Sequence, residues 1–258
     1  MQGTIKEFLI YLQGMDILGD IYSAFHLLSF FVAVPFFLWL AKKMNIGRVR
    51  AFFSLLTICA VFLVLIHVIG YIEASLGLGN FGRKNAVTIY IWLPLICFGA
   101  SRITKVEWGT LCTMMAPTMP LIQAASRPGC LFAGCCKGFE CSWGIYNVNA
   151  GNFRFPMPVF EMVWMLGIAL LILYLLKRQG YKPTRWLFPV MLVVFGGVQF
   201  VSEFYIDNAK IWGNWSLRSF HEVSMVVVGA VWLWGIYLKW TKEKERKNRF
   251  KKPQQKKN

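Results

Sequence analysis

The stretch Ala116–Gly138 reads APTMPLIQAASRPGCLFAGCCKG and lies between hydrophobic runs that are long enough to cross a lipid bilayer. It begins as an apolar segment that is interrupted by Pro117 and Pro120. It ends in a loop that is rich in glycine and cysteine and that contains two cations, Arg127 and Lys137. Small residues let backbone N–H groups approach a ligand, and an arginine binds a phosphate through two parallel hydrogen bonds. This composition suits an anionic headgroup at a membrane surface, and an ordinary inter-helix loop is the alternative interpretation.

The overall composition indicates an integral membrane protein. The 258 residues are 57% hydrophobic and 16% charged, whereas a soluble domain has about 25% charged residues. The net charge of +16 does not indicate nucleic-acid binding, because ten of the 28 Lys and Arg residues lie in the tail Lys239–Asn258. A basic tail directly after an apolar helix is typical of a topology signal and of contact with anionic lipids.

Seven apolar runs predict an all-α integral membrane protein, since about 20 apolar residues in a helix cross a bilayer. The run Val106–Ala125 is the least hydrophobic of the seven. Residues 1–240 are expected to form a single transmembrane domain, and the basic tail 241–258 is expected to be disordered. The first run follows no basic segment of the signal-peptide type, so it is expected to be retained. The predicted spans are Ile21–Ala41, Ala51–Ile72, Ala86–Ala100, Val106–Ala125, Met157–Leu176, Trp186–Ile206 and Phe220–Leu238.

The distribution of basic residues predicts the orientation. The segments that follow the first, third, fifth and seventh runs contain 20 of the 28 Lys and Arg residues. Cytoplasmic loops are enriched in these residues, so the N-terminus is predicted to lie outside and the C-terminus in the cytoplasm of a bacterial-type plasma membrane. The long segment Ser126–Pro156 then faces outward.

Three carboxylates inside apolar runs, Glu161, Glu203 and Glu222, lie near the outward ends of their runs. A charge at the bilayer centre costs about 2.5–3.5 kcal/mol on insertion scales. Because all three fall on one face, we expect a functional cavity there, with interfacial snorkelling as the alternative. Each of the three histidines is more readily interpreted as a packing residue than as a catalyst; they are His26, His67 and His221.

Four of the seven cysteines cluster in the outward loop with the spacing C-x4-C-C-x4-C. Structural zinc sites usually contain two C-x(2–4)-C pairs, so the sequence predicts neither a metal site nor a cofactor. Disulfide formation or simple packing is favoured, and a reactive thiol or a metal site stays open. The four are Cys130, Cys135, Cys136 and Cys141.

The stretch Ala116–Gly138 resembles the prolipoprotein diacylglyceryl transferases. That family typically reads A-P-x-x-P, six residues, R-x-G-N-F, and then a closing G-E-x-x-G. The family's Asn is Cys130 in this chain, and its acidic residue in G-E is Cys135. The residues that keep the register without a gap are Ala116, Pro117, Pro120, Arg127, Gly129, Gly134 and Gly138.

Three further stretches match the family in order, so the resemblance covers most of the chain. The family's Tyr near the outer end of the first span corresponds to Tyr22. Its R-H-P-x-Q-L-Y-E, which opens a helix, corresponds to Arg154–Glu161. Its F-R-x-x-x-E-F corresponds to residues 198–204, with Gln199 in place of the arginine. The family's His-Gly-Gly segment has no counterpart.

The resemblance implies transfer of a diacylglyceryl group from phosphatidylglycerol to the thiol of a lipobox cysteine in a prolipoprotein. Glycerol phosphate would leave, and this departure needs a cation close to the phosphate. Membrane lipids and these two substrates are the expected partners, and nucleic acid is not one. The expected catalytic residues are Arg127, Glu203 and Tyr22. The expected substrate-binding residues are Gly129, Gly138, Glu161, Arg154, Gln199 and His221.

Loss of the arginine at position 199 raises the question of which residue replaces its charge. The nearby cations Lys137 and Arg154 are the expected replacements. Two alternative functions stay open beside the transferase. One is a catalytically silent relative that binds a lipid headgroup or a membrane partner, and the other is a thiol- or metal-handling membrane protein.

Overall fold

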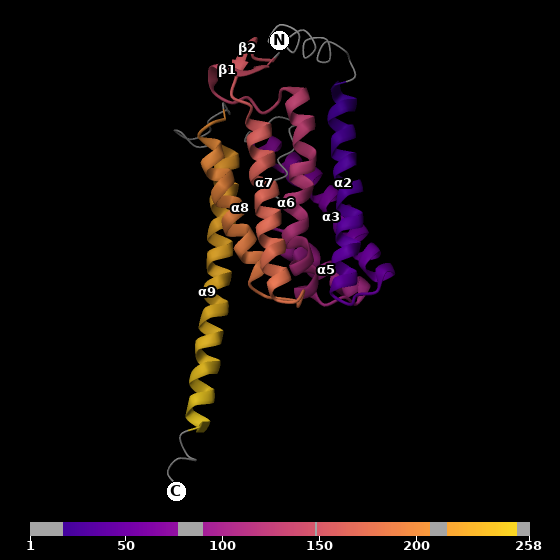
Figure 1. Cartoon of the computed structure of the whole chain (residues 1–258), viewed down its shortest axis with the longest axis vertical. Helices are drawn as coiled ribbons and strands as arrows, with labels where there is room; N and C mark the ends of the chain where they lie inside the picture. Colours follow the sequence, from indigo (N-terminus) through magenta and orange to yellow (C-terminus); the bar gives the residue numbers. More distant parts are fainter. Residues whose placement is uncertain (1–17, 77–89, 148, 207–215, 252–258) are drawn as a thin grey trace.

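A helical bundle capped at one end by a small β-hairpin makes up the part of the chain that the computed structural model describes, residues 18–76, 90–147, 149–206 and 216–251 (Figure 1). Between α6 and α7, the strands β1 (Glu140–Asn147) and β2 (Asn152–Arg154) pair antiparallel. The helices in these ranges are α2 (Leu18–Lys43), α3 (Arg48–Ser75), α5 (Leu93–Thr104), α6 (Trp108–Ala133), α7 (Met157–Arg178), α8 (Leu187–Glu203) and α9 (Leu217–Lys251).

Helix α6 lies at the centre of the bundle and packs against α2, α5, α7 and α8. Every residue from Thr110 to Pro120 is buried, so this part of the helix faces protein on all sides. That position explains why the corresponding run is the least hydrophobic. Three prolines lie inside the helix, and prolines are tolerated in membrane helices that are surrounded by other helices. A polar contact also joins α6 to the turn after α7, because Thr113 Oγ1 lies 2.9 Å from Thr184 O.

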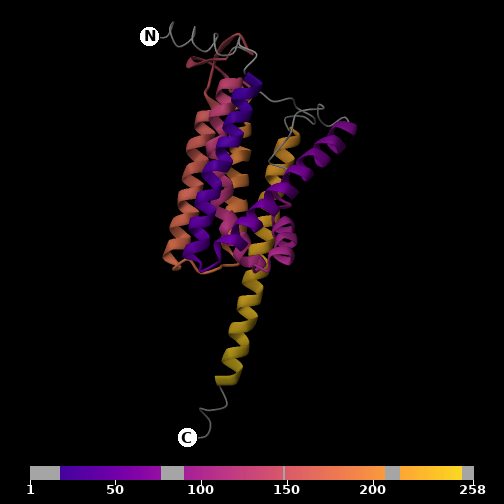
Figure 2. The ribbon, with the colours of Figure 1, turned by 90° about the vertical axis from the view of Figure 1, so that its right-hand side faces the viewer.

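The outer faces of the bundle are apolar, as expected for contact with lipid. Large apolar side chains such as Phe31, Val64, Leu170 and Val231 are more than half exposed. Among the described helices, four are long and apolar enough to cross a membrane, while α5 and α8 are apolar but shorter. Figure 2 shows α3 leaning away from the other helices toward its C-terminal end. The prediction of an all-α membrane protein is confirmed, and the seven described helices match the expected count of spans roughly.

Three predicted boundaries differ from the structure. The third run yields only the twelve-residue helix α5, and its first residues lie outside the described ranges. Helix α6 continues to Ala133, so Arg127 lies on the helix and not in the loop. Helix α9 continues through the basic segment to Lys251, where the sequence predicts disorder. Figures 1 and 2 show the end of α9 extending beyond the other helices.

The hairpin is tied to the end of α6. Gly134 has a φ of +61°, a left-handed conformation that favours glycine, and it ends the helix. The side chain of Asn147 donates a 3.1 Å hydrogen bond to Gly134 O, and that of Asn149 donates a 2.8 Å bond to Ala133 O. These bonds satisfy carbonyls that the end of a helix leaves unpaired. The hairpin therefore fixes the chain direction just after α6.

Helices α8 and α9 cross closely at two glycines. A Cβ added to Gly196 would lie 2.8 Å from the backbone O of Glu222, and one added to Gly229 would lie 2.8 Å from the backbone O of Pro189. Small residues allow this approach of two helix backbones in a membrane. The crossing holds the first turns of α9 against α8.

We expect Gly196→Val to lower the apparent Tm of the full-length protein in detergent by about 5 °C, because overpacking costs about 1–3 kcal/mol. Gly197→Val is the matched control, since a Cβ at Gly197 meets nothing within 4 Å. Thermal unfolding followed by circular dichroism measures both. Equal shifts in the two variants would contradict the close crossing.

Candidate functional site

Ionised side chains from four helices meet near the hairpin end of the bundle. Arg127 on α6 places Nη1 3.1 Å from Oε2 of Glu161 on α7. Arg218 on α9 places Nη2 2.6 Å from the other oxygen of the same carboxylate. Glu161 is fully buried and joins the two guanidinium groups. Helix α6 ends, α7 begins, α8 ends and α9 begins at this end of the bundle (Figure 1).

Arg218 is the hub of the other contacts. Its Nε lies 2.7 Å from Oε1 of Glu222 and 3.5 Å from Oε2 of Glu203, and its Nη2 donates to Oε1 of Gln199. These three partners are buried, like Glu161. We call this set the charged cluster: Arg127, Glu161, Gln199, Glu203, Arg218 and Glu222.

The start of α9 is held in place by its own cap. Ser216 precedes the helix, and its Oγ accepts a 3.2 Å hydrogen bond from the backbone N–H of Ser219. The Oγ of Ser219 accepts a 3.3 Å bond from the N–H of Ser216, so the two serines cap the helix reciprocally. Ser216 also donates to Oε1 of Glu203. The cap therefore links the first turn of α9, which contains Arg218, to the end of α8.

The two arginines differ in how many of their guanidinium donors have partners. Arg218 contacts three carboxylates and one amide, whereas Glu161 is the one carboxylate that pairs with Arg127 among the described residues. The Nε of Arg127 is buried and has no hydrogen-bond partner there. A buried, unused guanidinium donor is costly, so it favours an anionic or polar ligand. The cluster holds two arginines and three glutamates, so its formal charge is −1 when all are ionised, and Arg127 is the cation with donors to spare.

The structure brings together several of the predicted site residues. The three carboxylates gather around Arg218, as the sequence predicts for one face, and Arg127 pairs with Glu161. Gly129 is buried on α6 two residues after Arg127. His221 lies on α9 beside Glu222. Tyr22 lies on α2, and its side chain is outside the part of the chain that the structure describes.

Two other predicted residues lie in or next to the hairpin: Arg154 ends β2, and Gly138 precedes β1. Gly138 lies so close to Phe155 that an added Cβ would be 2.3 Å from its backbone O. Arg154 donates a 2.7 Å hydrogen bond to the side chain of Asn152 and a 3.2 Å bond to Gly138 O. These contacts connect the hairpin to the segment that follows α6. Their role in binding substrate stays a prediction.

Arg218 was not among the site residues predicted from the sequence. Lys137 or Arg154 was expected to replace the arginine lost at position 199, but the guanidinium that contacts Gln199 belongs to Arg218. Lys137 donates to Asn149 O in the hairpin instead. The spacing of Arg218 and Glu222, four residues apart at the start of an apolar run, was a detectable signal for a pair on one helix face.

Two thiols lie beside Arg127, and a third, Cys135, lies beside them. Nη1 of Arg127 is 3.8 Å from Sγ of Cys130 and 3.7 Å from Sγ of Cys136. All seven cysteines are free, so the structure has no disulfide among them, and of the favoured interpretation only simple packing remains. We call Cys130, Cys135 and Cys136 the thiol cluster.

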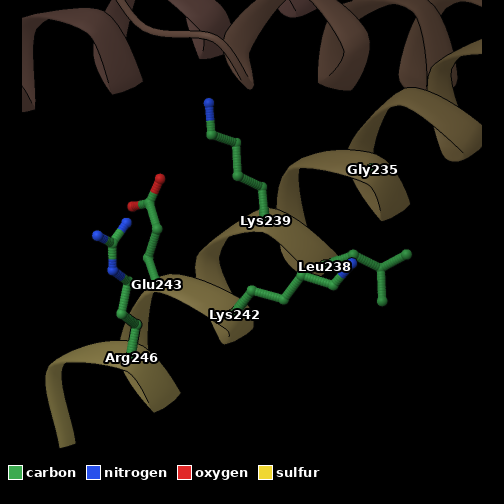
Figure 3. Close-up of a pocket in the computed structure, with 6 residues that line it drawn as sticks. All are labelled: Gly235, Leu238, Lys239, Lys242, Glu243 and Arg246. Carbon is green, nitrogen blue, oxygen red and sulfur yellow. The ribbon is translucent and has the colours of Figure 1, made fainter. Parts of the chain in front are cut away.

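A hollow beside the C-terminal part of α9 is separate from the charged cluster (Figure 3). Its lining comes from one helix, and Arg246 lies about 40 Å along that helix from Arg218. It therefore takes no part in the site described above. It is lined by Gly235, Leu238, Lys239, Lys242, Glu243 and Arg246.

The fold and the cluster define a multi-helix membrane protein with a buried arginine–carboxylate site at one end. The sequence model of the prolipoprotein diacylglyceryl transferase family matches residues 9–235, and the chain belongs to that family.

Curated relatives are similar over part of the chain. A protein named phosphatidylglycerol–prolipoprotein diacylglyceryl transferase from Cupriavidus metallidurans is 24% identical over 60% of this chain and 58% of its own length. One of the same name from Dehalococcoides mccartyi is 28% identical over 52% of this chain and 56% of its own length. The chain thus spans a little over half the length of these relatives.

Proposed function

We propose that this protein transfers a diacylglyceryl group from phosphatidylglycerol to the cysteine thiol of a prolipoprotein, a step of lipoprotein maturation. Membership of the family and the names of the curated relatives support this assignment. The observation that carries it is Arg127, a buried cation with an unused donor, held by Glu161 at the end of the bundle.

In the proposed reaction, Arg127 binds the phosphate of the phospholipid. The acceptor sulfur attacks the glycerol carbon that is bonded to the phosphate ester oxygen, and the C–O bond breaks. Its electron pair leaves with glycerol phosphate, and the proton of the thiol passes to the solvent or to the leaving phosphate. A fixed guanidinium stabilises the charge that develops on this oxygen. Glu161 positions Arg127, while Arg218 fixes Glu161 from the opposite side.

The test is a transfer assay with purified full-length protein, phosphatidylglycerol in mixed micelles and a fluorescent lipobox peptide. We expect a mobility shift of the peptide together with release of glycerol phosphate. A peptide with serine in place of the cysteine is the control and should not shift. Lipid binding without a shift would contradict the enzyme assignment and would favour the catalytically silent lipid-binding relative.

We also propose that the hairpin faces the outside of the plasma membrane and the α7–α8 turn faces the cytoplasm. The basic residues in the last turn of α7, Lys177 and Arg178, and Lys182 and Arg185 in the turn that follows support this orientation. A membrane-impermeant maleimide applied to intact cells should label Ser142→Cys strongly and Lys182→Cys weakly, since both positions are exposed. Wild-type protein gives the background from native thiols. Preferential labelling of Lys182→Cys would reverse the orientation.

A further inference from the structure

The thiol cluster is brought together by the way α6 ends. Cys130 lies in the last turn of α6, and the left-handed residue Gly134 turns the chain back so that Cys135 and Cys136 follow at once. The three Sγ atoms all lie within 4.8 Å of one another. The C-x4-C-C spacing, which does not resemble a linear zinc motif, therefore still places three sulfurs at one point.

The distances suit a shared metal ion better than a disulfide between the neighbours. Sγ of Cys135 and Sγ of Cys136 are 3.8 Å apart. Two sulfurs bound to one tetrahedral Zn²⁺ at about 2.3 Å lie about 3.8 Å apart. The Cα atoms of adjacent residues are about 3.8 Å apart, which is shorter than the range of about 4.4–6.8 Å in disulfides.

The charges near the sulfurs also suit a divalent ion. Three thiolates and one Zn²⁺ give a formal charge of −1, and Nη1 of Arg127 lies within 4 Å of two of the three sulfurs. The guanidinium thus stabilises the loaded site by ion pairing. The described residues place no further cysteine, histidine, aspartate or glutamate in this group, so a tetrahedral ion would keep one position open.

We propose that Cys130, Cys135 and Cys136 bind Zn²⁺ and that the open position takes the thiol of the acceptor. The second clause rests on the proposed function. The acceptor thiol loses its proton to the solvent when its sulfur becomes the fourth ligand, because metal ligation requires the thiolate. That sulfur then forms the bond to the glycerol carbon, and the leaving glycerol phosphate keeps the electron pair of the broken C–O bond. The site would supply activation of the acceptor thiol next to Arg127.

The test begins with metal binding alone. Full-length protein in detergent is reduced, stripped with a chelator and titrated with Co²⁺, whose thiolate charge-transfer absorption reports sulfur ligation. We expect one equivalent to bind and Zn²⁺ to displace it. Each of Cys130→Ser, Cys135→Ser and Cys136→Ser should weaken binding at least about 100-fold. Cys141→Ser, a change in the same loop but outside the thiol cluster, should bind like the wild type.

A second measurement tests the open position. Adding a lipobox peptide to the Co²⁺-loaded protein should increase the charge-transfer absorption by about one third, because a fourth thiolate joins three. The serine peptide should leave the spectrum unchanged.

The outcomes separate this proposal from the proposed function. Absence of the Co²⁺ band in protein whose thiols are reduced, or equal weakening by Cys141→Ser, would overturn the metal site. A Co²⁺ charge-transfer band that does not change when the cysteine peptide is added would overturn the open position. Diacylglyceryl transfer that persists in fully metal-free protein would also overturn the open position. The proposed function would then stand. Loss of transfer by wild-type protein that binds Zn²⁺ normally would contradict the proposed function and leave the metal site standing.

Discussion

Replacing Arg127 with alanine is expected to lower kcat/KM for diacylglyceryl transfer by about 100- to 1000-fold, the usual effect of removing one group that stabilises developing negative charge. The change removes the one cation of the charged cluster that has donors to spare. The fold should persist, because Glu161 keeps its 2.6 Å contact with Arg218. Arg127→Lys keeps the charge but not the forked geometry, and it should recover only part of the rate. The peptide mobility-shift assay measures all three proteins.

Lys137→Ala is the matched control for this prediction. Lys137 is a cation in the loop that follows α6, but its Nζ donates to the backbone O of Asn149 and so belongs to the hairpin. Its loss should change the rate less than about twofold, since one exposed hydrogen bond contributes little. Transfer at the wild-type rate by Arg127→Ala would remove Arg127 from the site. A large loss in Lys137→Ala would show that the phosphate binds nearer to the hairpin.

Replacing Arg218 with alanine should affect stability more than any other single change in the charged cluster. The substitution leaves three buried carboxylates, Glu161, Glu203 and Glu222, without the guanidinium they share. Removing one partner of a buried pair costs about 3–5 kcal/mol because an uncompensated charge stays behind. We expect a fall of about 10 °C in the apparent Tm of the full-length protein in detergent, measured by circular dichroism.

Two second-site changes make this prediction specific. Adding Glu222→Gln to Arg218→Ala removes one of the unpaired carboxylates and should raise the apparent Tm again. Exchanging the two positions, with Gln199→Arg and Arg218→Gln in one protein, returns an arginine to the cluster from α8, because the two side chains are in contact. The exchanged protein should be more stable than Arg218→Ala. An unchanged Tm in Arg218→Ala, or no recovery in either double variant, would contradict the role of Arg218 as the hub.

Hydropathy predicted the boundaries of the lipid-facing helices α2, α3 and α7 accurately. It predicted the boundaries of the central helix α6 poorly. The runs that became α2, α3 and α7 have long apolar faces, so their boundaries were close to the observed ones. Helix α6 runs past the predicted end at Ala125, through Pro128, Gly129 and Cys130, because tertiary burial overrides the weak helix propensity of these residues.

The site residues that could be predicted are those whose residue type is unusual at their place in the sequence. A carboxylate inside an apolar run is conspicuous, so Glu161, Glu203 and Glu222 were assigned to one face, and the structure confirms that they meet. Arg218 precedes such a run and was counted among ordinary loop cations. Its contact with Gln199 depends on the crossing of α8 and α9, which no local pattern encodes. The thiol cluster depends in the same way on the turn at Gly134.

The burial of α6 on all sides between Thr110 and Pro120 has a consequence for how the protein enters the membrane. Further along the same helix lie Gln123, Arg127 and Cys130, about one turn apart. The helix also contains three prolines. An arginine inside an apolar helix is costly to insert into lipid. Contact with lipid alone therefore stabilises α6 little in the membrane. We expect its insertion to depend on packing against α2, which is synthesised before it, and against α7, which is synthesised after it. Helix α7 also brings Glu161 to Arg127. We therefore expect the ion pair between Arg127 and Glu161 to form as the central helix inserts, so that insertion of α6 and assembly of the site are cooperative.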